Sequence, residues 1–178
     1  MPNTASTQAV FEFLDNTHRD IDAQLKILVS LVVAIEAGEL TSDQRQEAKS
    51  VLEFFRGEAR QHHLDEEKHI FPALLQSTEA SVAATARHLE QDHGWLEQTW
   101  LEIDPCLEAA AIGNFWFEPT ELRHALDVFT GLYQDHMTLE ESVAYPLAHS
   151  RLLASDTAGM GREMAKRRAA SKAAEKTD

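Results

Sequence analysis

One sequence pattern occurs twice in this chain of 178 residues, and it restricts what the chain can fold into. Residues 62–72 read HHLDEEKHIFP and residues 136–146 read HMTLEESVAYP, so both fit H-x-x-x-E-E-x-x-x-[FY]-P. The corresponding pairs are His62 with His136, Glu66 with Glu140, Glu67 with Glu141, Phe71 with Tyr145 and Pro72 with Pro146. A His and a Glu four residues apart lie on the same face of an α-helix. One copy alone would be an ordinary surface pair, whereas two copies within a longer shared pattern indicate metal binding.

The residue types of the chain narrow the choice of metal and of compartment. Imidazole and carboxylate ligands together suit iron, manganese or zinc. The single cysteine, Cys106, excludes a thiolate site and any disulfide within the chain. The N-terminal residues lack the basic start and apolar run of a signal peptide, and no apolar run has transmembrane length. We therefore expect a cytoplasmic protein with one main domain.

The charge of the chain is unevenly distributed. The net charge is −14, but the segment from Arg162 onward carries six Lys or Arg and three Asp or Glu. The rest of the chain is strongly acidic, so it should repel nucleic acid and anionic membranes. We therefore expect neither as a partner.

Apolar residues at spacings of three and four predict an all-α protein. The predicted helices run from about residue 10 to Gly38, and over about 44–76, 79–111 and 119–154. Short connections between long helices favour an antiparallel up-down-up-down four-helix bundle, which we place at residues 8–155. Residues 156–178 are small and charged with no apolar period, so we expect a basic tail that is disordered or at most part-helical.

Each predicted helix carries a histidine on its apolar stripe. Counted from one end of such a bundle at roughly 1.5 Å per residue, the four histidines fall within about 10 Å in height. The predicted metal ligands in this layer are His18, His62, Glu66, His93, His136 and Glu140. Six ligands are too many for one tetrahedral zinc ion. They suit two octahedral ions that share Glu66 and Glu140 as bridges, and this nitrogen-rich set favours iron.

These motifs resemble the bacterial hemerythrin-like, or HHE cation-binding, family. The likeness rests on an early His in the first helix, H-x-x-x-E in the second, Asp92-His93 in the third and H-x-x-x-E-E with [FY]-P in the fourth. It covers roughly residues 10–150. The resemblance implies a four-helix bundle that holds two iron ions bridged by an oxo or hydroxo group. Members of the family bind oxygen, sense oxygen, nitric oxide or redox state, handle iron, or act on peroxide.

The chain departs from the oxygen-carrying hemerythrins at two ligand positions. Those proteins have two histidines four apart in the third helix, whereas here Leu89 stands four residues before His93. They also use an Asp five residues after the fourth-helix His, where this chain has Glu141, and the repeat favours Glu140 instead. The missing nitrogen ligand puts oxygen transport in doubt. The alternatives that could replace it are Glu97, His63, His69 or water.

Three functions follow as hypotheses. The first is a di-iron protein that binds oxygen, nitric oxide or peroxide in a sensing or protective role. The second is a di-iron enzyme with catalase-like or oxidase activity. Ferritin-like oxidases carry E-x-x-H, with Glu before His, so the order found here argues against that class. The third is a metal buffer or an interaction bundle. The oligomeric state is not encoded in any of these patterns.

Overall fold

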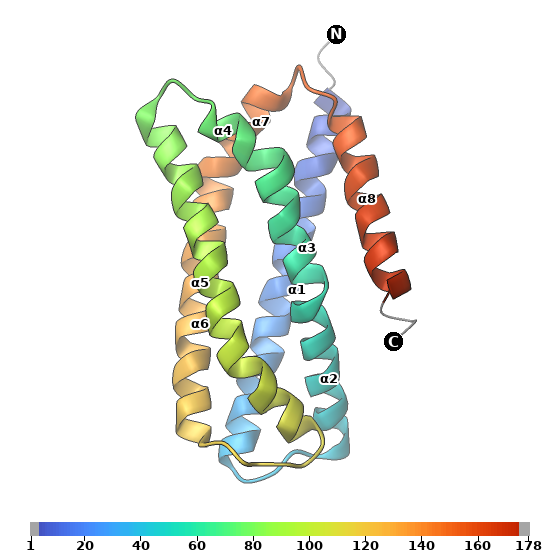
Figure 1. Ribbon diagram of the computed structural model, residues 1–178, viewed down its shortest axis with the longest axis vertical. Helices are drawn as coiled ribbons and strands as arrows, with labels where there is room; N and C mark the ends of the chain where they lie inside the picture. Colours follow the sequence, from blue (N-terminus) through green and yellow to red (C-terminus); the bar gives the residue numbers. More distant parts are fainter. Residues whose placement is uncertain (1–3, 175–178) are drawn as a thin grey trace.

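The structure, a computed structural model, describes residues 4–174, and all of its regular secondary structure over that range is helical (Figure 1). The all-α class predicted from the sequence is therefore confirmed. Four long segments lie side by side along the molecule, and a further helix lies against them. The long segments are α1 (Thr4–Glu36); α2 (Ser42–Arg56), α3 (Glu58–Asp65), η1 (Glu66–Ile70) and α4 (Phe71–Leu75) in succession; α5 (Ala80–Ala111); and α6 (Pro119–Leu139), η2 (Glu140–Ala144) and α7 (Tyr145–Leu152) in succession.

The ends of the long segments follow from their local sequence. Gly38 has φ +122°, a left-handed conformation that suits glycine, and α1 ends just before it as predicted. Thr41 caps α2 through a reciprocal pair of hydrogen bonds with Gln44, which satisfies donors that the helix leaves unpaired. Pro119 occupies the first turn of α6, where its missing N–H costs nothing.

Two single-turn π segments, η1 and η2, interrupt the second and fourth long helices at equivalent positions. In η1 the Phe71 N–H donates to the carbonyl of Glu66, and in η2 the Tyr145 N–H donates to that of Glu140. A proline follows each of these donors. Its ring lacks an N–H and crowds the carbonyl four residues back, so a widened turn lets the helix continue. Pro72 lies in the first turn of α4, directly after this wider turn.

The apolar core consists of two clusters with a polar layer between them. One cluster includes Ile21 and Leu96, and the other includes Leu14 and Leu89. His18 lies between Leu14 and Ile21 on α1, so the change from one cluster to the other occurs at a histidine. The same change takes place around His93 on α5. The layer predicted from the four stripes is therefore a real discontinuity in the core.

The C-terminal segment differs from the prediction. Residues 157–174 form helix α8 (Thr157–Ala174), which contacts α1 and α3; the last four residues of the expected tail lie outside the described range. Both ion pairs and apolar contacts attach α8: Arg167 and Arg168 bind the fully buried Asp65 of α3, and Met164 is buried in an apolar core cluster. This fifth helix makes the molecule more than a plain four-helix bundle. No helix within residues 4–174 is long and apolar enough to cross a membrane.

The start of α1 also differs from the prediction, since the helix begins at Thr4 rather than near residue 10. The extra turn is covered by α8: Thr7 is fully buried, and its hydroxyl is hydrogen-bonded to that of Thr157 at 3.2 Å. The C-terminal helix therefore orders the N-terminal turn.

Candidate metal centre

The six residues predicted as metal ligands are brought together in the polar layer. None of them is more than 5 % exposed. They come from all four long segments and reach the centre from α1, α3, η1, α5, α6 and η2. The set is His18, His62, Glu66, His93, His136 and Glu140.

The ligand atoms form two overlapping groups of four, each within 4.8 Å. His18 and His62 belong to one group, His93 and His136 belong to the other, and Glu66 and Glu140 belong to both. Each group contains enough ligand atoms for one ion, and the two groups have the two carboxylates in common.

The distances show that each glutamate lies between histidines of two different helices. A Glu66 carboxylate oxygen is 3.3 Å from His62 Nε2, and the other is 3.4 Å from His93 Nε2. Glu140 Oε2 lies 3.2 Å from His18 Nε2 and 3.3 Å from His136 Nε2. The Nε2 atoms of all four histidines therefore face the carboxylates.

Several buried polar atoms of the centre have no hydrogen-bond partner within the described residues. They are both ring nitrogens of His62, His136 Nδ1, Glu66 Oε2 and both carboxylate oxygens of Glu140. Burying a carboxylate without such partners costs several kcal/mol. A bound cation would satisfy His62 Nε2 and the carboxylate oxygens among these atoms, and imidazole with carboxylate is a donor set that fits iron. The residues present therefore fit the metal expected from the sequence.

The charges of the metal-free centre are strongly coupled. Burial and the neighbouring Glu140 raise the pKa of Glu66 to about 7. Burial opposes a charge on Glu140, but His136 and His18 hold its pKa well below the usual value. Burial likewise opposes charge on these two histidines, yet the carboxylates raise the pKa of His18 to about 9 and that of His136 to about 10. Without metal, protons provide the positive charge that the buried carboxylates require.

The second glutamate of each repeat supports a histidine from outside the buried layer. Glu67 accepts a hydrogen bond from Nδ1 of His93 at 2.7 Å, and Glu141 accepts one from Nδ1 of His18 at 2.9 Å. A carboxylate on Nδ1 fixes the tautomer and leaves Nε2 free to bind a metal. Both glutamates are at least 40 % exposed, so Glu140 rather than Glu141 belongs to the buried layer. The sequence analysis did not assign this supporting role, although the second Glu of the E-E pair is present in both copies of the repeat.

Tyr145 is a further residue of the centre that sequence reasoning did not assign. Its hydroxyl donates a short hydrogen bond to Glu66 Oε1 and lies 3.1 Å from His18 Nε2. Burial and the two glutamates raise the pKa of Tyr145 well above its usual value, so the hydroxyl keeps its proton. In the first repeat the corresponding residue is Phe71, whose ring stacks against His93 with centroids 5.4 Å apart.

Three of the residues considered as additional ligands are not clustered with the others. Glu97 pairs with Arg60 at 2.8 Å on the surface, and His69 pairs with Glu163 of α8 at 2.6 Å. Glu141 supports His18 as described above. His63 differs from these, because its ring nitrogens group with those of His93 and His136 within 4.8 Å.

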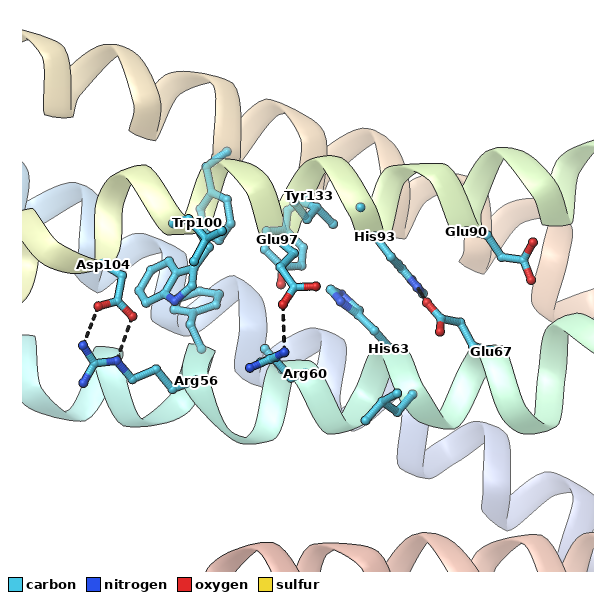
Figure 2. Close-up of a pocket in the computed structure, with 17 residues that line it drawn as sticks. Arg56, Arg60, His63, Glu67, Glu90, His93, Glu97, Trp100, Asp104 and Tyr133 are labelled. Carbon is cyan, nitrogen blue, oxygen red and sulfur yellow. Dashed lines mark hydrogen bonds and ion pairs between the residues drawn. The ribbon is translucent and has the colours of Figure 1, made fainter. Parts of the chain in front are cut away.

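A cleft of about 370 Å³ reaches the centre from the surface between α2–α3 and α5. Figure 2 shows His63 and His93 at one end of this cleft and the Arg56–Asp104 ion pair at the other. The ion pair between Arg60 and Glu97 crosses it in between. Gly94 lines the cleft, and a Cβ added there would meet nothing within 4 Å, which leaves this wall open.

Comparison with known families identifies the class to which this fold and centre belong. The family model described as the hemerythrin HHE cation binding domain matches residues 9–148. The chain therefore belongs to the hemerythrin HHE cation-binding family. No individual curated protein gives a significant match. The family match spans the four long segments almost completely and ends before α8.

Proposed function

We propose that this chain is a cytoplasmic di-iron protein that binds oxygen, nitric oxide or peroxide in a sensing or protective role. The observation that carries the proposal is the pair of ligand groups that share Glu66 and Glu140. His18 and His62 would hold one ion, and His93 and His136 would hold the other. Bound iron would supply redox chemistry and a coordination position for a small ligand.

The proposal assigns definite tasks to the residues around the ligands. Glu67 and Glu141 orient two of the histidines, and Tyr145 holds a proton beside Glu66 and His18. The apolar clusters on either side of the layer exclude water from the buried carboxylates. The four long segments would serve as an antiparallel up-down-up-down bundle with α8 added outside it. The strongly acidic charge supports a function without nucleic acid or membrane partners.

The test is the metal content of the full chain, expressed in iron-rich medium and purified without chelators, together with its absorption spectrum. We expect two irons per chain and a charge-transfer band in the near ultraviolet. Addition of nitric oxide or peroxide should change that band. A normally folded chain that binds no iron, or one that binds a single zinc ion, would contradict the proposal. Glu97→Ala is the matched control, because Glu97 is an exposed carboxylate outside the buried layer.

A catalase-like activity is the second candidate. The Tyr145 hydroxyl favours it, because a proton donor lies within hydrogen-bond distance of a predicted bridging carboxylate. The iron-loaded protein should then release oxygen from peroxide, and Glu66→Ala should abolish the release. Tyr145→Phe should reduce the release without removing iron. A loaded wild-type protein that merely binds peroxide would assign the chain to the first function.

A further inference from the structure

The cleft between α2–α3 and α5 has an aromatic interior that the proposed function leaves unused. Four rings that line it pack together and are no more than 7 % exposed: Phe55, Trp100, Phe129 and Tyr133. Their centroids lie 4.8 Å apart for Phe55 and Trp100, 5.6 Å for Trp100 and Phe129, and 4.9 Å for Phe129 and Tyr133. In Figure 2, Trp100 and Tyr133 lie between the outer ion pair and the histidines. A volume of about 370 Å³ and aromatic walls are typical of sites for small organic molecules.

One of these rings carries a hydrogen-bond donor without a partner. Nε1 of Trp100 is buried and pairs with no atom of the described residues. An indole N–H can only donate, and buried tryptophans usually pair it. A phenylalanine would provide an aromatic wall without burying an unpaired donor. Because Trp100 lines the cleft, the acceptor that its N–H lacks can come from a molecule bound there.

The charges at the rim of the cleft disfavour an ionic molecule. Arg56 is paired with Asp104 at 2.7 Å. Arg60 is paired with Glu97 at 2.8 Å, so both guanidinium groups that line the cleft already have a carboxylate partner. Glu90 adds a further carboxylate, which would repel an anion. A cation would be attracted by the carboxylates, but it offers no acceptor to the N–H of Trp100. A neutral molecule with an oxygen acceptor avoids both conflicts.

We propose that the cleft binds a neutral aromatic molecule of one or two rings that carries a carbonyl oxygen. The ring system would pack against the aromatic wall, and the carbonyl oxygen would accept a hydrogen bond from Nε1 of Trp100. The inference goes beyond the function proposed above and needs no metal. Figure 2 shows His63 and His93 at the inner end of the cleft, so a molecule held there would lie beside the buried layer.

The test is equilibrium dialysis of the metal-free full chain with three molecules that share one bicyclic skeleton. Tetralone has a ketone oxygen, tetralin has no acceptor, and protonated aminotetralin carries a positive charge. We expect one tetralone to bind per chain, and Trp100→Phe to weaken its binding roughly two- to tenfold, because one net hydrogen bond is lost. The same variant should leave the affinity for tetralin unchanged. Trp95→Phe is the matched control, because Trp95 is an exposed ring of the same helix.

Proton–nitrogen NMR spectra of the wild type test the contact directly. The chain has three tryptophans, so its metal-free form should give three indole N–H signals. Tetralone should move the Trp100 proton to lower field than tetralin does. Trp95 and Trp116, which are 54 % and 64 % exposed, should not respond. Trp95→Phe and Trp116→Phe identify the other two signals, so the measurement stands even if Trp100→Phe does not fold.

Substitution of Gly94 tests whether the molecule occupies this cleft. A Cβ at Gly94 would meet nothing within 4 Å, so a larger side chain can extend into the cleft without displacing its neighbours. Gly94→Leu should therefore abolish tetralone binding, and Gly94→Ala should keep it.

Four results would each overturn the inference. They are a wild type that binds no tetralone at millimolar concentration, unchanged tetralone affinity in Trp100→Phe, unchanged affinity in Gly94→Leu, and tighter binding of aminotetralin than of tetralone. The last result would assign the cleft to a cation. Iron content is measured separately, so a chain that binds tetralone but no iron would contradict only the function proposed above.

Discussion

The two copies of the repeat share the same local structure but have different surroundings. Each has a buried glutamate at the start of a π segment and an exposed glutamate that supports a histidine of a neighbouring helix. The residue before Glu66 in the sequence, however, is the buried Asp65, whereas the residue before Glu140 is the apolar Leu139. The motif therefore fixes the ligand geometry in both copies. The identity of the residues around the motif depends on what packs against each copy. Four predictions test this comparison.

The largest effect is expected from the shared carboxylates. Glu66→Ala and Glu140→Ala should each abolish the binding of two ions, because each glutamate faces both ion positions. Metal content after iron loading measures this directly. If one variant kept two ions while the other lost them, the two copies would not be equivalent as bridges. The exposed Glu97→Ala should keep both ions.

The next largest effect is expected from the ion pairs that join α8 to Asp65, beside the first copy of the repeat. The double variant Arg167→Ala/Arg168→Ala removes both cations from the fully buried Asp65. An unpaired buried carboxylate costs about 3 kcal/mol or more, so urea denaturation of the metal-free protein should show a loss of that order. Arg162→Ala, on the exposed side of α8, should change stability by less than about 0.5 kcal/mol. A double variant as stable as wild type would mean that α8 is not held by these pairs.

The exposed glutamates should contribute equally in the two copies. Glu67→Ala and Glu141→Ala each remove the acceptor from a histidine Nδ1, and loss of such a supporting contact typically weakens metal binding by about 10–100-fold. Co²⁺ titration measures the change. Glu67→Gln and Glu141→Gln keep an acceptor oxygen and should lose less affinity. An effect in only one copy would show that the symmetry of the repeat does not extend to the supporting carboxylates.

The smallest effect should come from the aromatic residue before the proline. Tyr145→Phe makes the second copy match the first, and it removes the hydrogen bond to Glu66. We expect a loss of about 1 kcal/mol in the metal-free protein, measured by thermal or urea denaturation. No change would indicate that Glu66 is equally well satisfied without the hydroxyl.

The helices and the members of the buried layer could be predicted from the sequence because both show in the spacing of apolar residues. His18 and His93 stand on apolar stripes, where a polar residue interrupts a regular spacing. Such interruptions can be recognised in one helix without knowing which residues of the other helices they contact. Whether these residues bind metal stays a prediction, but their convergence follows from the periodicity alone.

What the sequence did not reveal depends on contacts between distant residues. Arg167 and Arg168 look like part of a basic tail, because their partner Asp65 lies about a hundred residues earlier and has no periodic relation to them. His69 and Glu97 could be considered as additional ligands for the same reason: their partners, Glu163 and Arg60, lie on other helices and are not evident from the sequence. The π segments are shifts of one residue in hydrogen bonding, which no apolar spacing records.

The attachment of α8 has a consequence for how the chain should be divided and how it can evolve. The family match ends at residue 148, yet Asp65 inside it depends on cations outside it. A protein cut at that boundary would lack part of its cooperative folding unit. Because Asp65 is paired with Arg167 and Arg168, we expect these residues to change together in evolution. Relatives without a helix equivalent to α8 are therefore expected to carry an uncharged residue in place of Asp65, as the second repeat already does with Leu139.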